Sequence, residues 1–244
     1  MGNETKRILS FLRDGDFAHP GEIEAIDLIT GSIPKNIHQN ILDIGCGLGG
    51  TANYLYQNGF GNVIGIDIDT DLINYALKKY TDISFVNCDV MESPKFLKQS
   101  FQLMICMNAF FCFKDQKESL KQLLKLADQN CELIIFDYSQ FDSDLIESPF
   151  YWSKTASRFC PIHLDKFKKT LAESGWHYQS SIDITAQFEV WYQALLHQFE
   201  IKKQDMMTHF DHDLVNKMYD GYCQLLQLIR DKKVGGIVVY ATRK

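Results

Sequence analysis

The sequence predicts an α/β fold built on a largely parallel sheet. From residue 41 onward, short apolar runs alternate with amphipathic stretches whose apolar residues recur at helical spacing. A glycine-rich turn, "GCGLGG" at 45–50, follows the first apolar run directly. This alternation is typical of strands joined by crossover helices, and such sheets bind ligands at the carboxyl ends of their strands. We therefore expect a ligand site at the glycine turn.

Each element of the predicted sheet has its own signal. The expected strands are the apolar runs at 41–45, 62–67, 83–89, 101–107, 131–138, 180–185 and 236–242. The expected helices between them lie at 50–59, 71–80, 115–127 and 161–175. The helix at 115–127 has an acidic start, and Asn130 is expected to form a left-handed cap behind it. Gly175 is expected to end the last of these helices.

Two helical segments stand outside the alternation. Residues 1–36, with a break at "HPG", are predicted to form an N-terminal helical cap or flap, and residues 187–231 a helical lid inserted before the last strand. Residues 37–186 and 232–244 would then form the α/β core. The inserted segment carries an apolar stripe at helical spacing: Phe188, Trp191, Tyr192, Leu195, Leu196 and Phe199. Such a stripe can close over a site or form a subunit interface, so a homodimer stays open.

Composition excludes some classes of protein. The 244 residues include 31 acidic and 25 basic side chains, and this net charge of −6 argues against a nucleic-acid partner. Neither a signal-peptide core nor an apolar run of membrane-spanning length occurs, so no membrane partner is expected. The seven cysteines form no C-x-x-C pair and indicate reduced thiols in a cytoplasmic protein.

The glycine turn allows two functional interpretations. Residues 45–50 fit the G-x-G-x-x-G pattern of dinucleotide sites, but Asp43 would face an anionic pyrophosphate unfavourably and suits a ligand with an ammonium group. Asp67 ends the second strand, where it can hold the ribose hydroxyls of either ligand. Asp89, after the third strand, could accept from an adenine amino group. A purely structural turn is the remaining alternative.

Five stretches in order, "DIGCGLGG", "VIGIDID", "FVNCDV", "FQLMICMNAFFCF" and "ELIIFDYS", resemble the motif series of class I S-adenosylmethionine-dependent methyltransferases. The resemblance covers residues 40–139. It implies a Rossmann-like seven-stranded sheet, mostly parallel with an antiparallel last strand, and S-adenosylmethionine as cofactor. The implied cofactor-binding residues are Asp43, Gly45, Cys46, Gly47, Gly49, Asp67, Ile68, Asp89, Val90, Met107 and Asn108. Gln102 departs from the family, which usually has an acid there.

The flanking segments resemble small-amine methyltransferases of the phosphoethanolamine and sarcosine/dimethylglycine type. This resemblance implies methyl transfer to a small-molecule acceptor, most naturally at an amine nitrogen. It places Tyr138 and Arg158 near the acceptor, with Arg158 as a clamp for phosphate or carboxylate. "AHPGE" at 18–22 resembles an N-terminal flap from which His19 could reach the substrate. Asn108 and Cys112 stand where phosphoethanolamine enzymes carry an acid and a histidine.

Methyl transfer leaves little catalytic signature, because a direct displacement mainly requires alignment and exclusion of water. The catalytic candidates are therefore His19, Asn108, Tyr138 and Arg158, and no metal is expected. The aromatic run at 110–113 belongs either to the core or to a wall of the site. An RNA or protein methyltransferase, and a non-catalytic S-adenosylmethionine-binding protein, remain alternatives.

Overall fold

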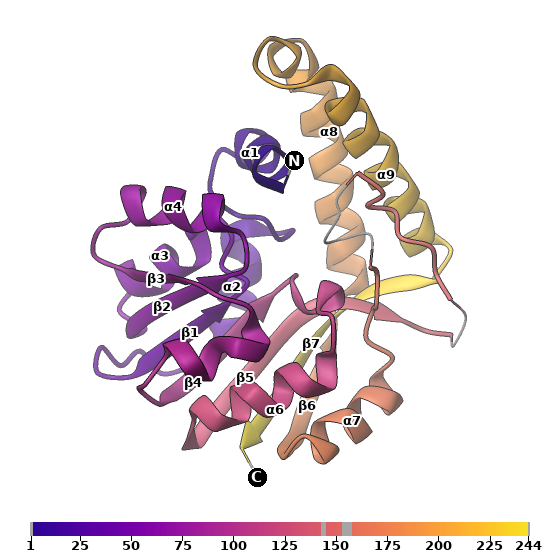
Figure 1. Ribbon diagram of the computed structural model, residues 1–244. Coiled ribbons are helices and arrows are strands. Elements are labelled where there is room, and N and C mark those ends of the chain that lie inside the picture. Colours follow the sequence, from indigo (N-terminus) through magenta and orange to yellow (C-terminus); the bar gives the residue numbers. More distant parts are fainter. Residues whose placement is uncertain (1, 143–144, 153–157, 244) are drawn as a thin grey trace.

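The computed structural model describes residues 2–142, 145–152 and 158–243, which form an α/β fold around a seven-stranded sheet of order β3-β2-β1-β4-β5-β7-β6 (Figure 1). The strands are β1 (Asn40–Ile44), β2 (Asn62–Asp67), β3 (Ser84–Asn87), β4 (Phe101–Met107), β5 (Ala127–Gln140), β6 (Trp176–Asp183) and β7 (Val234–Arg243). The pairings from β3 across to β5 are parallel, and β7 runs antiparallel to both β5 and β6. The predicted Rossmann-like class with an antiparallel last strand is confirmed.

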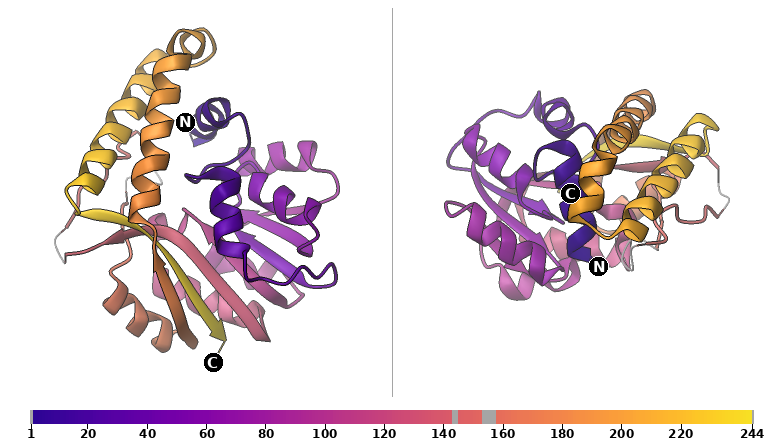
Figure 2. Two further views of the ribbon diagram at one scale, coloured as in Figure 1. Left: turned by 180° about the vertical axis from the view of Figure 1, so that it is seen from behind. Right: turned by 90° about the horizontal axis from the view of Figure 1, so that it is seen from above.

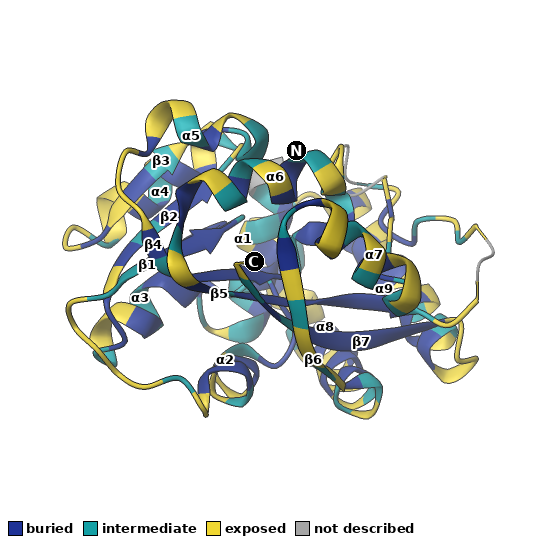
Figure 3. Ribbon diagram, turned by 90° about the horizontal axis from the view of Figure 1, so that it is seen from below, coloured by how far each residue is buried: buried dark blue, intermediate teal, exposed yellow. Residues whose placement is uncertain are grey.

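Helices cover both faces of this sheet. They are α1 (Gly2–Arg13), α2 (Glu22–Thr30), α3 (Gly50–Gln57), α4 (Thr70–Lys79), α5 (Ser93–Phe96), α6 (Gln116–Leu126), α7 (Leu164–Glu173), α8 (Thr185–His209) and α9 (His212–Arg230), with 3-10 turns η1 (Val90–Glu92) and η2 (Phe110–Cys112). Because side chains alternate along a strand, Ile41 packs toward α2, α3 and α8 while Leu42 packs toward α6 and α7. Most strands are thus buried between helices with exposed outer faces (Figure 3).

The order of strands reverses between β1 and β4. The chain leaves β1 toward β2 and β3, then returns to β4 on the other side of β1. Asp43 of β1 lies opposite Ile105 of β4, so the glycine turn after β1 and the end of β4 at Met107 share one edge of the sheet. Such a switch point is where open α/β sheets bind ligands.

The two largest differences from the predicted boundaries lie at the starts of β5 and β6. Asn130 does not cap a helix: α6 ends at Leu126, and Asn130 lies within β5, whose first residue Ala127 already pairs with Phe101. Burial of Ala127 and pairing with β4 override the local turn preference. The strand expected at 180–185 begins earlier, at Trp176, because Gly175 (φ 87°) turns the chain directly into pairing with β7. The role of Gly175 as a helix end is confirmed.

Helices α8 and α9, which lie between β6 and β7 along the chain, form a pair that extends beyond the carboxyl edge of the sheet. Helix α1 lies beside this pair (Figures 1 and 2). The predicted apolar stripe is buried throughout α8. Lys202 of α8 donates to the Phe11 carbonyl oxygen at 2.9 Å and to the Asp14 carboxylate at 2.8 Å. The Trp191 indole nitrogen donates to the Glu24 carboxylate at 3.0 Å. The N-terminal helices are therefore joined to α8 by packing and by specific polar contacts.

The segment that joins α1 to α2 is also attached to α4 and to Tyr80, which follows α4. Asp16 is buried and accepts hydrogen bonds from Ser10, Tyr75 and Tyr80, and it pairs with the Lys79 ammonium at 2.6 Å. Burial raises the Asp16 pKa, but Lys79, Tyr80 and Ser10 outweigh that effect and lower the pKa below its ordinary value. In the described part of the chain, no helix is both long and apolar enough to cross a membrane.

Candidate active site

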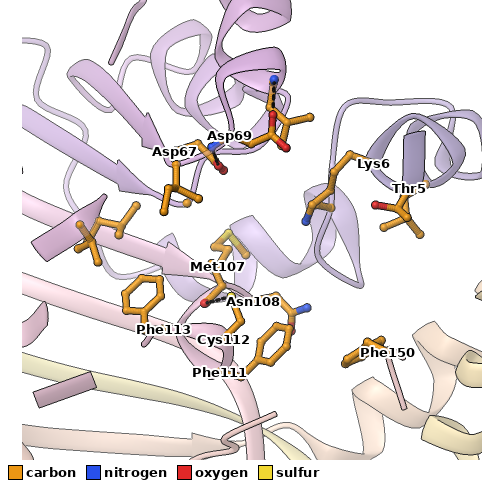
Figure 4. A pocket seen from close by; sticks show the side chains of 18 of the residues that line it. Thr5, Lys6, Asp67, Asp69, Met107, Asn108, Phe111, Cys112, Phe113 and Phe150 are labelled. Atoms are coloured by element: carbon orange, nitrogen blue, oxygen red, sulfur yellow. Dashed lines mark hydrogen bonds between the residues drawn. The ribbon is translucent and has the colours of Figure 1, made fainter. Parts of the chain in front are cut away.

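A cavity of about 370 Å³ opens at the carboxyl edge of the sheet, beneath α1 and against α9 (Figure 4). We call the part formed by the ends of β1, β2 and β3 the strand-end half; it includes Gly45, Asp67, Ile68, Asp69, Asp89 and Val90. The part formed by η2, β5, residues 145–152 and α9 is the aromatic half; it includes Phe111, Tyr138, Phe150, Trp152, Met218 and Tyr222. Met107 and Asn108, at the end of β4, lie where the two halves join.

The glycine turn supplies backbone and open space to the strand-end half. Gly45 has a φ of 73°, and a Cβ atom there would lie 2.6 Å from the Ala109 Cβ, so a side chain is excluded. Gly47 has a φ of 55°, and a Cβ atom there would have the Ala18 Cβ, 4.0 Å away, as its nearest neighbour. A side chain at either position would therefore strain the backbone, and at Gly47 it would also fill open space beside the turn.

Asp67 is fixed in place by the backbone around it. One carboxylate oxygen accepts from the Gly47 N–H at 2.9 Å, and the other accepts from the Asp69 N–H at 2.9 Å. Burial raises the Asp67 pKa, and these backbone donors together with the Lys6 charge oppose that rise. Each carboxylate oxygen can accept a further hydrogen bond, so Asp67 suits a pair of neighbouring hydroxyl groups.

The end of β3 offers an acid between apolar side chains. Asp89 accepts from the Met91 N–H at 2.8 Å through one oxygen and lines the cavity. Val90 and Ile68 also line it, and Ile68 is 59% exposed. A carboxylate flanked by two apolar side chains fits a flat heterocycle that bears an amino group.

Four of the predicted cofactor residues, Asp43, Cys46, Gly47 and Gly49, are not among the residues that line the cavity. Asp43 is 2% exposed, accepts from the Ala52 N–H, and has one oxygen without a partner in the part of the chain that the structure describes. Burial, with the nearby Asp67 charge, raises the Asp43 pKa to about 7. Cys46 packs toward Gly65, and burial raises the pKa of its thiol well above the usual range, so it is no nucleophile.

Asn108 and Tyr138 form a polar contact at the junction of the halves. Asn108 adopts a φ of 54°, which its backbone N–H stabilises by donating to the Phe136 carbonyl at 2.7 Å. Its amide nitrogen donates to the Tyr138 hydroxyl at 3.3 Å, and that hydroxyl also hydrogen bonds to the Tyr192 hydroxyl. The Asn108 Oδ1 atom is buried without a partner among the described residues. Because Asn108 lines the cavity, a rotation of its side chain would let this oxygen accept a hydrogen bond from a ligand.

Two other candidates lie outside the cavity wall. The His19 ring is 3% exposed, with Nε2 3.0 Å from the Thr51 hydroxyl and Nδ1 3.2 Å from the Pro20 carbonyl oxygen. Burial lowers the His19 pKa to about 3, so the ring is neutral. Arg158 is exposed and donates to the Lys114 carbonyl oxygen at 2.6 Å. Their predicted roles at the acceptor stay predictions.

The structure divides the aromatic run at 110–113 and adds residues that the sequence did not single out. Phe111 and Phe113 line the cavity, whereas Phe110 packs in the core against Phe167. Met218 and Tyr222 lie one turn apart on α9, and that i, i+4 spacing could have placed them on one face. Thr5, Lys6, Phe150 and Trp152 also line the cavity, but no local pattern marks them.

Residues 41–130 match a family model described as a methyltransferase domain. The chain is 23% identical over 196 residues to phosphoethanolamine N-methyltransferase 1 of Zea mays, an alignment that takes in 78% of the chain but only 38% of the maize protein.

Two further comparisons cover more of the chain. It is 21% identical to phosphoethanolamine N-methyltransferase of Plasmodium falciparum, over 92% of this chain and 86% of that protein. The structure of Haemonchus contortus phosphoethanolamine N-methyltransferase 2, in complex with phosphomonomethylethanolamine and S-adenosylhomocysteine, matches with a TM-score of 0.86 and 18% identity. That match covers 99% of this chain and 57% of the other, and it shows the shared fold.

Proposed function

We propose that the protein transfers a methyl group from S-adenosylmethionine to an amine nitrogen of a small molecule. The observation that carries this proposal is the cavity itself, whose strand-end half suits a nucleoside and whose aromatic half suits a small acceptor, joined at Asn108. The sequence similarity to phosphoethanolamine N-methyltransferases supports an amine acceptor.

The strand-end half fits the cofactor. S-adenosylmethionine supplies a methyl group on a positively charged sulfur. Asp67 would hold the ribose hydroxyls, and Asp89, between Val90 and Ile68, would receive the adenine. The glycine turn leaves room for the methionine tail, and Asp43 behind it would supply a negative charge for the ammonium group when its carboxyl group is ionised, which its pKa of about 7 allows at neutral and higher pH.

The aromatic half would prepare the acceptor. We infer that Asn108 Oδ1 accepts an N–H of the acceptor amine and so directs the nitrogen lone pair toward the methyl group. The rings of Phe111, Tyr138 and Tyr222 exclude water, which lowers the pKa of a bound amine. The same ring faces favour the positively charged product. No histidine lines the described cavity wall, so the amine is proposed to enter in its neutral form.

The helices around the cavity would control access. We propose that residues 187–231 act as a lid on the α/β core (37–186 and 232–244) and residues 1–36 as its cap. Met218 and Tyr222 of α9 and Leu9 of α1 line the cavity and support this division. We further propose that the protein acts in the cytoplasm on a small molecule rather than on nucleic acid. A homodimer is testable by sedimentation of the full chain.

The proposal is tested in two steps on the full chain. Calorimetry with S-adenosylhomocysteine should show micromolar binding. Methyl-labelled S-adenosylmethionine should then label at least one member of a panel of phosphoethanolamine, ethanolamine, sarcosine and dimethylglycine, with bulk RNA and protein as controls. Binding without turnover of any amine would favour a non-catalytic S-adenosylmethionine-binding protein, and labelling of RNA or protein alone would favour the macromolecular alternative.

A further inference from the structure

Lys6 lies inside the cavity although it belongs to the first helix of the chain. It lines the cavity together with Gly45, Asp67 and Asn108, and Figure 4 shows its side chain reaching from α1 into the cavity. Helix α1 is held from both sides. Lys202 of α8 donates to the carbonyl oxygen of Phe11 near the end of α1, and Asp16, just after α1, pairs with Lys79 of α4. Lys6 is therefore carried by an anchored element rather than by a loose terminus.

The Lys6 ammonium has neither a hydrogen bond nor an ion pair within the ranges that the structure describes. Other lysines of the same fold are paired, such as Lys79 with Asp16 and Lys202 with Asp14. An ammonium group that is half-buried in a cavity is stabilised electrostatically by a negatively charged group of a ligand. The position of Lys6 therefore indicates an anionic group of the ligand.

The charge of Lys6 acts on the strand-end half. Burial raises the Asp67 pKa, and the Lys6 charge opposes that rise. In the aromatic half, burial raises the Cys112 pKa and the Lys6 charge again opposes the rise, whereas at Tyr222, whose pKa burial raises to about 12, the opposing charge is Arg13. Lys6 is thus electrostatically coupled to the ribose-binding acid, which lies next to the glycine turn.

The amino-acid tail of the cofactor carries one ammonium and one carboxylate group. Asp43 lies behind the glycine turn and matches the ammonium, which leaves the carboxylate in need of a positive partner. Among the described residues that line the cavity, Lys6 and Lys114 are the cations, and Lys114 is exposed beyond η2, on the acceptor side. Lys6 lines the same cavity as Gly45 of the glycine turn, and its side chain reaches into that cavity.

We propose that Lys6 binds the carboxylate of the cofactor's methionine tail, so that α1 closes over the cofactor as a part of its binding site. This inference rests on the proposed use of S-adenosylmethionine. It assigns the first helix to cofactor recognition, with the lysine as a carboxylate subsite.

The test compares two ligands that differ in the amino-acid tail. S-adenosylhomocysteine carries the carboxylate, whereas 5′-methylthioadenosine keeps the adenosine and the thioether without it. By calorimetry on the full chain, Lys6→Met should weaken S-adenosylhomocysteine binding at least about tenfold, as expected for a charge-assisted contact. The affinity for 5′-methylthioadenosine should stay within about twofold, since this nucleoside offers Lys6 no partner. Lys114→Met is the matched control, and Lys6→Arg should retain most of the affinity.

The outcomes separate this inference from the proposed function. If the wild type binds S-adenosylhomocysteine and Lys6→Met binds it equally well, the inference is overturned while the proposed function stands. Equal weakening of both ligands by Lys6→Met, or tail-specific weakening by Lys114→Met instead, also overturns it. A wild type that binds neither ligand overturns both proposals.

Discussion

The two halves of the cavity are assembled in different ways. Each acid of the strand-end half stands at or just after the end of a strand: Asp67 at the end of β2, and Asp89 two residues after β3. The aromatic half combines side chains from η2, β5, a loop and α9, which span positions 111 to 222. Short stretches of sequence therefore mark the residues of the strand-end half, whereas the aromatic half exists only because distant segments of the chain pack together. Variants should therefore separate nucleoside binding from methyl transfer.

The largest effect is expected at the glycine turn. Gly45→Val would place a branched side chain at positive φ and against Ala109, so S-adenosylhomocysteine affinity should fall more than about 100-fold, or about 3 kcal/mol. Gly59→Val is the matched control, because Gly59 also has positive φ (74°) but lies outside the cavity lining. It should lose stability yet keep the affinity of its folded fraction. Normal calorimetric binding by Gly45→Val would contradict the role of the turn.

Asp67, the acid proposed to bind the ribose, should have the next largest effect. Asp67→Ala removes charge-assisted hydrogen bonds worth about 1.5–3 kcal/mol, so S-adenosylhomocysteine affinity should fall about 10- to 150-fold. Asp71→Ala, on the exposed side of α4, should bind as the wild type does. Unchanged affinity in Asp67→Ala would place the ribose elsewhere.

A change in the aromatic half should lower the rate of methyl transfer rather than the affinity for S-adenosylhomocysteine. Tyr138→Phe removes the hydroxyl that joins Asn108 to Tyr192, so the Asn108 amide loses its anchor. We expect methyl transfer to a responsive amine to fall about tenfold, which is about 1.4 kcal/mol in the barrier, with S-adenosylhomocysteine affinity within about twofold. Tyr56→Phe, at an exposed site, is the control. A parallel loss of cofactor affinity would show that the halves are not separable.

The smallest expected effect is a pH dependence behind the glycine turn. Burial raises the Asp43 pKa from its ordinary 3.8 to about 7, so the folded chain favours the protonated acid. The contribution of Asp43 to stability is then fully present below pH 3.8 and is lost as pH rises toward 7. Asp43→Asn should raise the Tm relative to wild type by about 2–4 °C more at pH 8 than at pH 5. A difference independent of pH, measured by thermal unfolding without ligand, would contradict the raised pKa.

The sequence by itself determined the fold class and the edge of the sheet at which the site lies. Strand periodicity, the glycine turn and the acids at strand ends are local signals, and the sheet order with its antiparallel last strand confirmed what they and the family resemblance predicted. The proposed cofactor roles of Asp67 and Asp89 came from the same signals and stay predictions. The predicted cap at Asn130 was wrong because pairing of β5 with β4 outweighs a local turn preference.

Only the tertiary structure decided what completes the cavity. Lys6, Phe150 and Tyr222 are far apart along the chain and meet because α1, a loop and α9 pack over the same strand ends. The same packing turned Phe111 into the cavity and Phe110 into the core, and it buried His19 outside the cavity wall. These choices depend on long-range burial, which no short stretch of sequence encodes: a side chain faces a ligand only when its neighbours in space leave room for one.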